Sequence, residues 1–113
     1  MIREMEKITS PKEFFGFVPG SDCKLIRWDK IVEYFYLLQK ESERIKVIDM
    51  GPTTEGNPFL QVVISSPENL SRLDEIKRIS HMLAECTEIT TEERDELVKK
   101  GVCICVQNMS IHA

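Results

Sequence analysis

The sequence predicts an α/β fold in which a partial mixed sheet packs with about three helices. Two segments carry apolar residues at helical spacing, and they predict the two longer helices. Two short runs rich in β-branched residues flank a connection that is dense in turn residues, which is typical of a hairpin. A further apolar run at residues 102–106 is continuous, and such runs are typical of strands that are covered on both faces.

Residues 1–24 predict an extended or looped lead-in with room for one short turn of helix, because turn signals such as Ser10-Pro11 and Pro19-Gly20 interrupt it. The first long helix is expected to begin at Asp29, whose carboxylate can cap it, and to end near Arg44. One broad face of this helix is apolar and carries Ile31, Val32, Tyr34, Phe35, Leu37 and Leu38.

The segment after this helix predicts a wide hairpin. Residues 46–50 and 59–65 are rich in the strand-forming residues Val and Ile. Between them lies the turn segment Gly51-Pro-Thr-Thr-Glu-Gly-Asn-Pro58. Gly51 and Gly56 are interpreted as backbone-permissive turn residues and not as ligand contacts.

The second half of the chain predicts two more helices and then the buried strand. Ser66-Pro67 is a good helix opening, and apolar residues recur after it every three or four positions. Thr90 and Glu93 have capping-box spacing, and Gly101 stands where a left-handed cap would end that helix. No linker or repeat divides the chain, so residues 1–113 are expected to form a single domain.

Composition excludes several classes of function. The chain has 15 basic and 19 acidic side chains, and this balance argues against an electrostatic nucleic-acid binder. No apolar stretch has the features of a signal peptide or the length of a membrane span. We therefore expect a soluble, cytoplasmic chain whose four cysteines are small buried apolar residues: Cys23, Cys86, Cys103 and Cys105.

Few residues in this sequence have the pattern of a functional site. There is no P-loop, no dinucleotide-binding glycine motif, no nucleophile elbow and no paired C-x-x-C motif. His81 is expected to be an ordinary surface or boundary histidine. His112 follows the predicted buried strand, where α/β folds place ligand groups. From its position alone, His112 is either a terminal polar residue or a ligand.

Four segments, in this order, resemble the start of zinc carboxypeptidase domains of the carboxypeptidase A type. The turn segment and the strand after it resemble the family's G-x-T-x-E-G-R-P turn and strand. Trp28-Asp-Lys-Ile-Val-Glu-Tyr34 looks like the helix before that turn. Residues 65–74 are similar to a helix opening in one bacterial branch, and residues 102–113 look like the strand that leads into the H-x-x-E zinc motif.

The resemblance covers roughly residues 10–113 and implies the N-terminal portion of a carboxypeptidase-like α/β domain. His112 would be the first zinc ligand, and the Glu three residues after it would fall two positions beyond Ala113. The family's second His ligand, its substrate-binding arginines and its general-base Glu lie farther downstream. The resemblance therefore implies a fragment of a peptide hydrolase that holds zinc weakly, carries no catalytic residue of its own and is inactive alone.

Other interpretations stay open. Glu55 and Pro58 are given structural roles in the turn, and the alternative for Glu55 is a chemical carboxylate. A metal site of Cys103, Cys105 and His112 would need a bulge, because His112 has the opposite strand parity. One rival function is a non-enzymatic interaction module whose last strand is completed by a partner chain. The carboxypeptidase fragment itself is expected to self-associate through its exposed sheet edge, because the strand at residues 102–106 lacks its neighbours. Another rival is a thiol-dependent or metal-responsive protein that uses Cys103 and Cys105.

Overall fold

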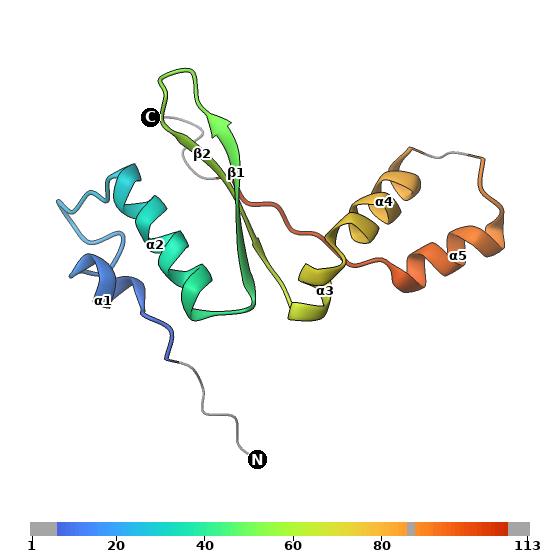
Figure 1. Cartoon of the computed structure of the whole chain (residues 1–113), viewed down its shortest axis with the longest axis horizontal. Coiled ribbons are helices and arrows are strands. Elements are labelled where there is room, and N and C mark those ends of the chain that lie inside the picture. Colours follow the sequence, from blue (N-terminus) through green and yellow to red (C-terminus); the bar gives the residue numbers. More distant parts are fainter. Residues whose placement is uncertain (1–6, 86–87, 109–113) are drawn as a thin grey trace, which may run out of the picture. The chain divides into compact units, whose positions relative to one another are not determined.

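The computed structural model describes residues 7–85 and 88–108 of the chain. The chain divides into two compact units, Met1–Ser71 and Arg72–Ala113. The helices and strands of the described residues follow one another in this order: α1 (Pro11–Phe15), α2 (Trp28–Glu41), β1 (Ile45–Pro52), β2 (Pro58–Ile64), α3 (Pro67–Ser71), α4 (Leu73–Ala84) and α5 (Thr91–Lys100) (Figure 1). This mixture of helices with a hairpin confirms an α/β composition.

The lead-in of the first unit contains the short helix α1. Ser10 and Glu13 form a complete capping box at its start, and Gly16 ends it in the left-handed conformation with φ +78°. The lead-in is also bound to α2, because both the amide and the hydroxyl of Thr9 donate to the carboxylate of Glu41. Residues 7–24 are therefore attached to the helix that follows them.

Helix α2 differs from the prediction at both ends. Arg27 is its N-cap and makes no side-chain capping bond, whereas Asp29 lies within the first turn. Asp29 does not cap the helix because it lies one residue inside it, and its Oδ1 accepts from Arg27 Nε at 3.1 Å. The helix stops at Glu41 and not near Arg44, because Ser42 is extended and its Oγ accepts from the Arg44 amide.

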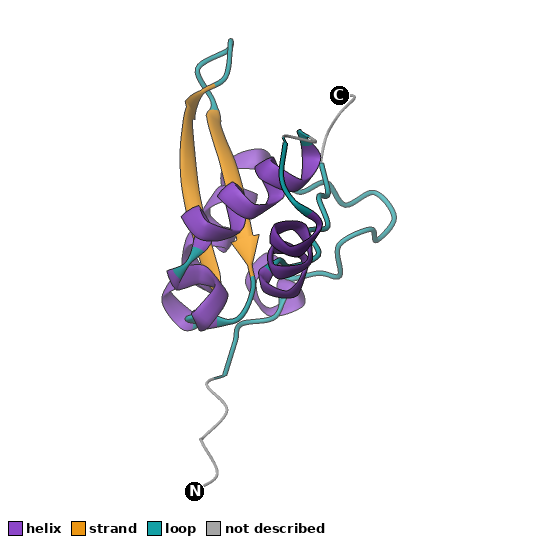
Figure 2. Cartoon of the chain, turned by 90° about the vertical axis from the view of Figure 1, so that its right-hand side faces the viewer, coloured by secondary structure: helices purple, strands orange, loops and turns teal. Residues whose placement is uncertain are grey.

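The predicted hairpin is confirmed. Strands β1 and β2 pair antiparallel, with Ile45 opposite Ile64 and Val47 opposite Val62, and the register becomes irregular between Asp49 and Pro52. The two strands lie side by side in Figure 2. Gln39 Oε1 accepts from the Val47 amide at 2.6 Å, which fastens the end of α2 to the first strand.

The core of the first unit centres on Tyr34, which is only 9% exposed. Its ring lies 5.0 Å from that of Phe14 and 5.2 Å from that of Phe15, both on α1. The Tyr34 hydroxyl donates to the Thr9 carbonyl at 2.7 Å, so its polar end is satisfied although it is buried.

The helix predicted to open at Ser66-Pro67 is interrupted. It begins as expected, with Ser66 Oγ accepting from the Asn69 amide. At Arg72, however, the backbone leaves helical geometry, with φ −120° and ψ 29°, and α4 starts at the next residue. The guanidinium of Arg72 pairs with Glu75 and also donates to the Lys100 carbonyl, a contact over 28 residues that local sequence patterns do not reveal.

The second unit contains the helices α4 and α5, which contact each other, and Ile76 and Ile79 of α4 are buried. The capping box of Thr90 and Glu93 is confirmed. The left-handed cap predicted at Gly101 is wrong, because Gly101 is extended with φ −67° and ψ 162°. A Cβ on Gly101 would lie 3.1 Å from the Leu97 carbonyl oxygen and 3.4 Å from Ile79 Cγ2. Close packing, and not a positive φ, accounts for this glycine.

The buried strand predicted at residues 102–106 is not found in the structure. The segment has no regular secondary structure, and the side chains of Ile104 and Val106 are 56% and 80% exposed. Cys103 and Cys105 are exposed free thiols and not buried apolar residues, and Cys23 is exposed as well. The apolar pattern requires neighbouring strands on both sides, and the sheet of the described residues contains only β1 and β2. Cys86 lies outside the described residues.

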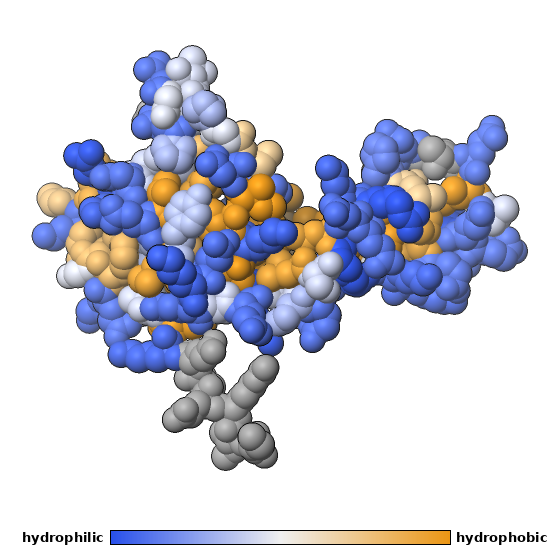
Figure 3. Space-filling view, viewed as in Figure 1, coloured by the Kyte–Doolittle hydropathy of each residue, from blue (hydrophilic) through white to orange (hydrophobic). Residues whose placement is uncertain are grey.

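Apolar residues lie at the surface of both units. The space-filling view shows orange residues open to solvent among blue polar ones (Figure 3). The most exposed large side chains include Leu25, Met50, Phe59 and Ile64 in the first unit and Val98 in the second. Within the described ranges, none of the helices combines the length and apolar character that crossing a membrane requires.

Candidate functional site

His112, the residue with the strongest case from the sequence, lies outside the described residues. Its proposed ligand role therefore stays a prediction. The described residue set holds no group of three or more His, Cys, Asp or Glu side chains arranged to bind a metal ion. The part of the candidate site that the structure does describe is the turn segment from Gly51 to Pro58.

The turn segment is organised around Thr53. Its amide donates to the Asn57 carbonyl at 2.8 Å, and its carbonyl accepts from the Gly56 amide at 2.9 Å. The Thr53 hydroxyl accepts from the Asn57 amide at 3.1 Å. Three hydrogen bonds within the turn segment thus hold the tip of the hairpin in this shape.

Two glycines allow this shape. Gly51 and Gly56 have φ angles of +93° and +77°, in the left-handed region that side chains with a Cβ disfavour. No heavy atom lies within 4 Å of the position that a Cβ would take on either glycine. Backbone conformation, and not crowding, is therefore what calls for glycine at these positions. The Gly51 amide donates to Asp49 Oδ1 at 2.8 Å, which fixes the point where β1 departs from regular pairing.

Pro58 connects the turn segment to helix α2. Its carbonyl accepts from the indole Nε1 of Trp28 at 2.9 Å. Trp28 is the first residue of α2, so this bond joins the start of the helix to the start of β2. Glu55 is exposed at the tip, and the structure gives it no hydrogen bond or ion pair with a described residue.

The two described cysteines of the second unit are accessible to solvent. Cys103 and Cys105 are separated by one residue and both are exposed. The structure does not bring a third metal-ligating side chain to them within the described ranges. Their chemistry is therefore that of two neighbouring thiols.

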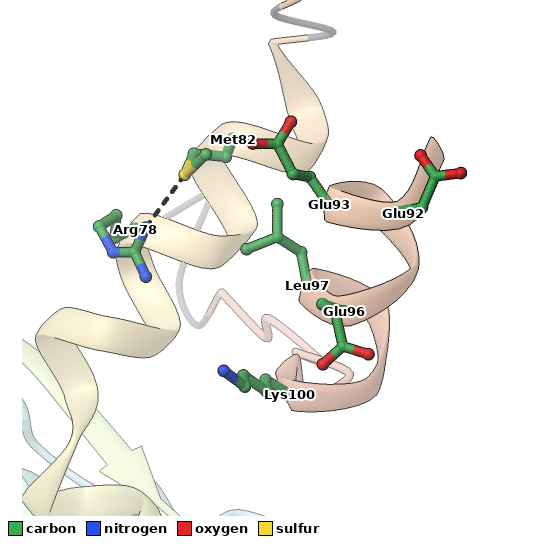
Figure 4. A pocket seen from close by; sticks show the side chains of 7 residues that line it. All are labelled: Arg78, Met82, Glu92, Glu93, Glu96, Leu97 and Lys100. Carbon is green, nitrogen blue, oxygen red and sulfur yellow. Dashed lines mark hydrogen bonds between the residues drawn. The ribbon is translucent and has the colours of Figure 1, made fainter. Parts of the chain in front are cut away.

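A shallow pocket of about 370 Å³ lies between α4 and α5. Figure 4 shows its lining residues: Arg78, Met82, Glu92, Glu93, Glu96, Leu97 and Lys100. Two of its carboxylates have local partners, since Glu93 completes the capping box and Glu96 pairs with Lys99 at 2.8 Å. Arg78 donates to Met82 Sδ at 3.2 Å. The pocket is a consequence of helix packing, and no signal in the sequence points to it.

Tyr34 and Glu13, both in the first unit, have shifted pKa values. Burial raises the pKa of Tyr34, and the nearby carboxylates of Glu41 and Glu13 raise it further. The pKa of Glu13 is lowered, chiefly because the Ser10 amide donates to its carboxylate. Both shifts follow from contacts that fold the lead-in, so neither marks a catalytic centre.

His81 has the environment expected of a surface histidine. Its side chain is 66% exposed, and Nε2 lies 3.1 Å from the Glu85 carboxylate one turn farther along α4. The pairing is a local contact between neighbours on one helix face. His81 therefore offers a control for any role assigned to His112.

Comparison of the chain with models of protein families, with curated proteins and with solved structures finds no match. The likeness to zinc carboxypeptidases consequently rests on the order of its four sequence segments and on the residues within them.

Proposed function

We propose that this chain corresponds to the N-terminal part of a zinc carboxypeptidase-type catalytic domain, with peptides as substrates and His112 as its first zinc ligand. The observation that supports this best is the hydrogen bond from Trp28 Nε1 to the Pro58 carbonyl. Trp28 opens the helix segment of the resemblance, and Pro58 closes the turn segment. Two segments that resemble consecutive parts of one family are thus in direct contact in the fold.

The arrangement of the first unit also agrees with the proposal. A helix, a hairpin and a further helix opening follow one another from α2 to α3, in the order of the first three segments of the resemblance. The turn segment is rigid through its own hydrogen bonds, so it is suited to hold two strands in register. We assign Gly51, Glu55, Gly56 and Pro58 to this structural role.

The chemistry of the proposed site depends on His112. Zinc in a site of three protein ligands and a water polarises the scissile carbonyl and lowers the pKa of that water. A single imidazole does not hold catalytic zinc tightly, and the remaining ligands of the family lie beyond Ala113. We therefore expect the 113-residue chain to be inactive by itself. We also propose that the protein is located in the cytoplasm, because free exposed thiols are typical of a reducing compartment.

The experiment is to express the reading frame together with the codons that follow it, as the original sequence and as His112→Ala. The original is expected to contain zinc and to release C-terminal residues from peptides. His112→Ala should lose zinc and at least about 100-fold in activity, with an unchanged circular dichroism spectrum. His81→Ala is the matched control and should change neither property. Equal zinc content and activity in the two histidine variants would reject the assignment.

The second candidate function is an interaction module without catalytic activity. It is favoured by the exposed apolar residues Ile104 and Val106, which a partner would cover. Under this alternative, the extended product would contain no zinc and would release no amino acid from peptides.

A further inference from the structure

The segment that follows α5 is apolar and unpaired. Residues 102–108 form neither helix nor strand, and no backbone hydrogen bond joins them to another described residue. The side chains of Ile104 and Val106 are 56% and 80% exposed, and Cys103 and Cys105 are exposed as well. A β-branched run with free backbone groups is well suited to strand pairing.

The sequence of this segment is a palindrome. Residues 102–106 read Val-Cys-Ile-Cys-Val in both directions. When two identical strands pair antiparallel about Ile104, the Ile104 side chains oppose each other. Each Val102 then faces Val106 of the second copy, and each Cys103 faces Cys105. Every cross-strand pair therefore joins side chains of similar size and chemistry, and no charge is buried.

We propose that two copies of this chain associate through antiparallel pairing of residues 102–106, with a two-fold axis at Ile104. Such an interface is isologous, because the same surface is used by both copies. Each copy contributes an apolar stripe of Val102, Ile104 and Val106 on one face and two thiols on the other. The inference stands on the composition and exposure of this segment and is independent of the proposed function.

The register of the pairing determines which cysteines can form a disulfide between the two copies. Directly opposed Cα atoms of antiparallel strands lie about 4.5 or about 5.5 Å apart, depending on the pair type. Both separations fall within the range of about 4.4–6.8 Å that disulfides span. Cys103 and Cys105 of one strand point to the same face and do not bridge each other. In the paired state, Cys103 of each copy can be cross-linked to Cys105 of the other.

The test uses the 113-residue chain with Cys23→Ser and Cys86→Ser as background. Cys103→Ser and Cys105→Ser are added separately, which leaves one of the two thiols in each variant. Oxidised glutathione supplies the oxidant: two protein thiols and one glutathione disulfide yield one protein disulfide and two glutathione thiols. Covalent dimer is measured by electrophoresis under non-reducing conditions.

The register predicts that neither single variant forms covalent dimer efficiently, because each remaining thiol faces a serine. An equal mixture of the two variants restores an opposed pair of thiols, and it should form at least about fivefold more covalent dimer than either variant alone. Parallel pairing or random collision would instead cross-link each variant by itself. That result would overturn the proposal, as would a mixture that forms no covalent dimer.

A second measurement needs no cysteine chemistry. Ile104→Lys places two like charges at the axis and should shift the chain from dimer to monomer in light scattering at micromolar concentration. Gln107→Lys is the matched control, because it adds the same charge just outside the paired residues. An original chain that is monomeric throughout this range, or an Ile104→Lys variant that still dimerises, would overturn the proposal.

Discussion

Tyr34 shows how one residue holds the lead-in against α2. Its ring packs on two phenylalanines of α1, and its hydroxyl donates to the Thr9 carbonyl. Tyr34→Phe keeps the ring and removes this bond, which should cost about 1 kcal/mol of unfolding free energy in denaturant titrations. The control is Tyr36→Phe on the same helix, where the side chain is 37% exposed. An equal effect of both substitutions would contradict the role given to the Tyr34 hydroxyl.

The raised pKa of Tyr34 predicts a pH dependence at high pH. Because the folded pKa lies above the ordinary value of 10.0, the fold favours the neutral phenol. This contribution to stability is fully present below about pH 10 and is lost as pH rises through the folded pKa. The difference in unfolding free energy between the original chain and Tyr34→Phe should therefore shrink above about pH 10. A constant difference from pH about 9 to about 11 would show that burial of the phenol is unimportant.

Gly56 is predicted to be needed for the backbone conformation of the turn segment. With φ +77° and open space around the missing Cβ, Gly56→Ala should destabilise the hairpin by about 1 kcal/mol through backbone strain alone. Gly56→Asn should cost less, because Asn tolerates the left-handed region better than other residues with a Cβ. Thermal melts of the two variants give the comparison. Equal melting temperatures for Ala and Asn would contradict a conformational role for this glycine.

At the scale of elements, the contact between α2 and the hairpin is the one most closely tied to the proposed function. Trp28→Phe keeps an aromatic ring and removes the indole donor to the Pro58 carbonyl. The expected cost is about 1 kcal/mol, measured by circular dichroism because this is the only tryptophan of the chain. An unchanged unfolding midpoint would show that the helix and the turn do not support each other.

Elements whose signals are local were predictable from the sequence. The hairpin follows from two β-branched runs around a turn, and the capping box of α5 follows from the spacing of Thr90 and Glu93. The predicted start of α2 is wrong, because Asp29 has a side chain typical of an N-cap but lies within the first turn of the helix. The break at Arg72 was missed because its bond to Lys100 joins residues that are far apart in the sequence.

At the scale of the whole molecule, the chain consists of two units. The sequence pattern and the structure disagree at residues 102–106, where a buried strand is predicted and none is found. A continuous apolar run is typical of a strand that lies between two neighbouring strands, but those neighbours must come from elsewhere in the sheet. Ile104 and Val106 are consequently exposed, although their sequence is typical of a core. The turn with Gly51 and Gly56 could be predicted from the sequence, because backbone positions with positive φ angles favour glycine. The expectation for His112 rests on resemblance, and this residue lies outside the described ranges.

The assignment of His112 to the start of a zinc motif is tested most directly by sequencing the source DNA after the codon for Ala113. We predict that a reading frame, continuous or recovered by a single shift, encodes Glu three residues after His112 and a further His downstream. If both residues are absent from every frame, His112 does not begin a zinc motif, and the partners of the exposed segment at residues 102–106 become the next question.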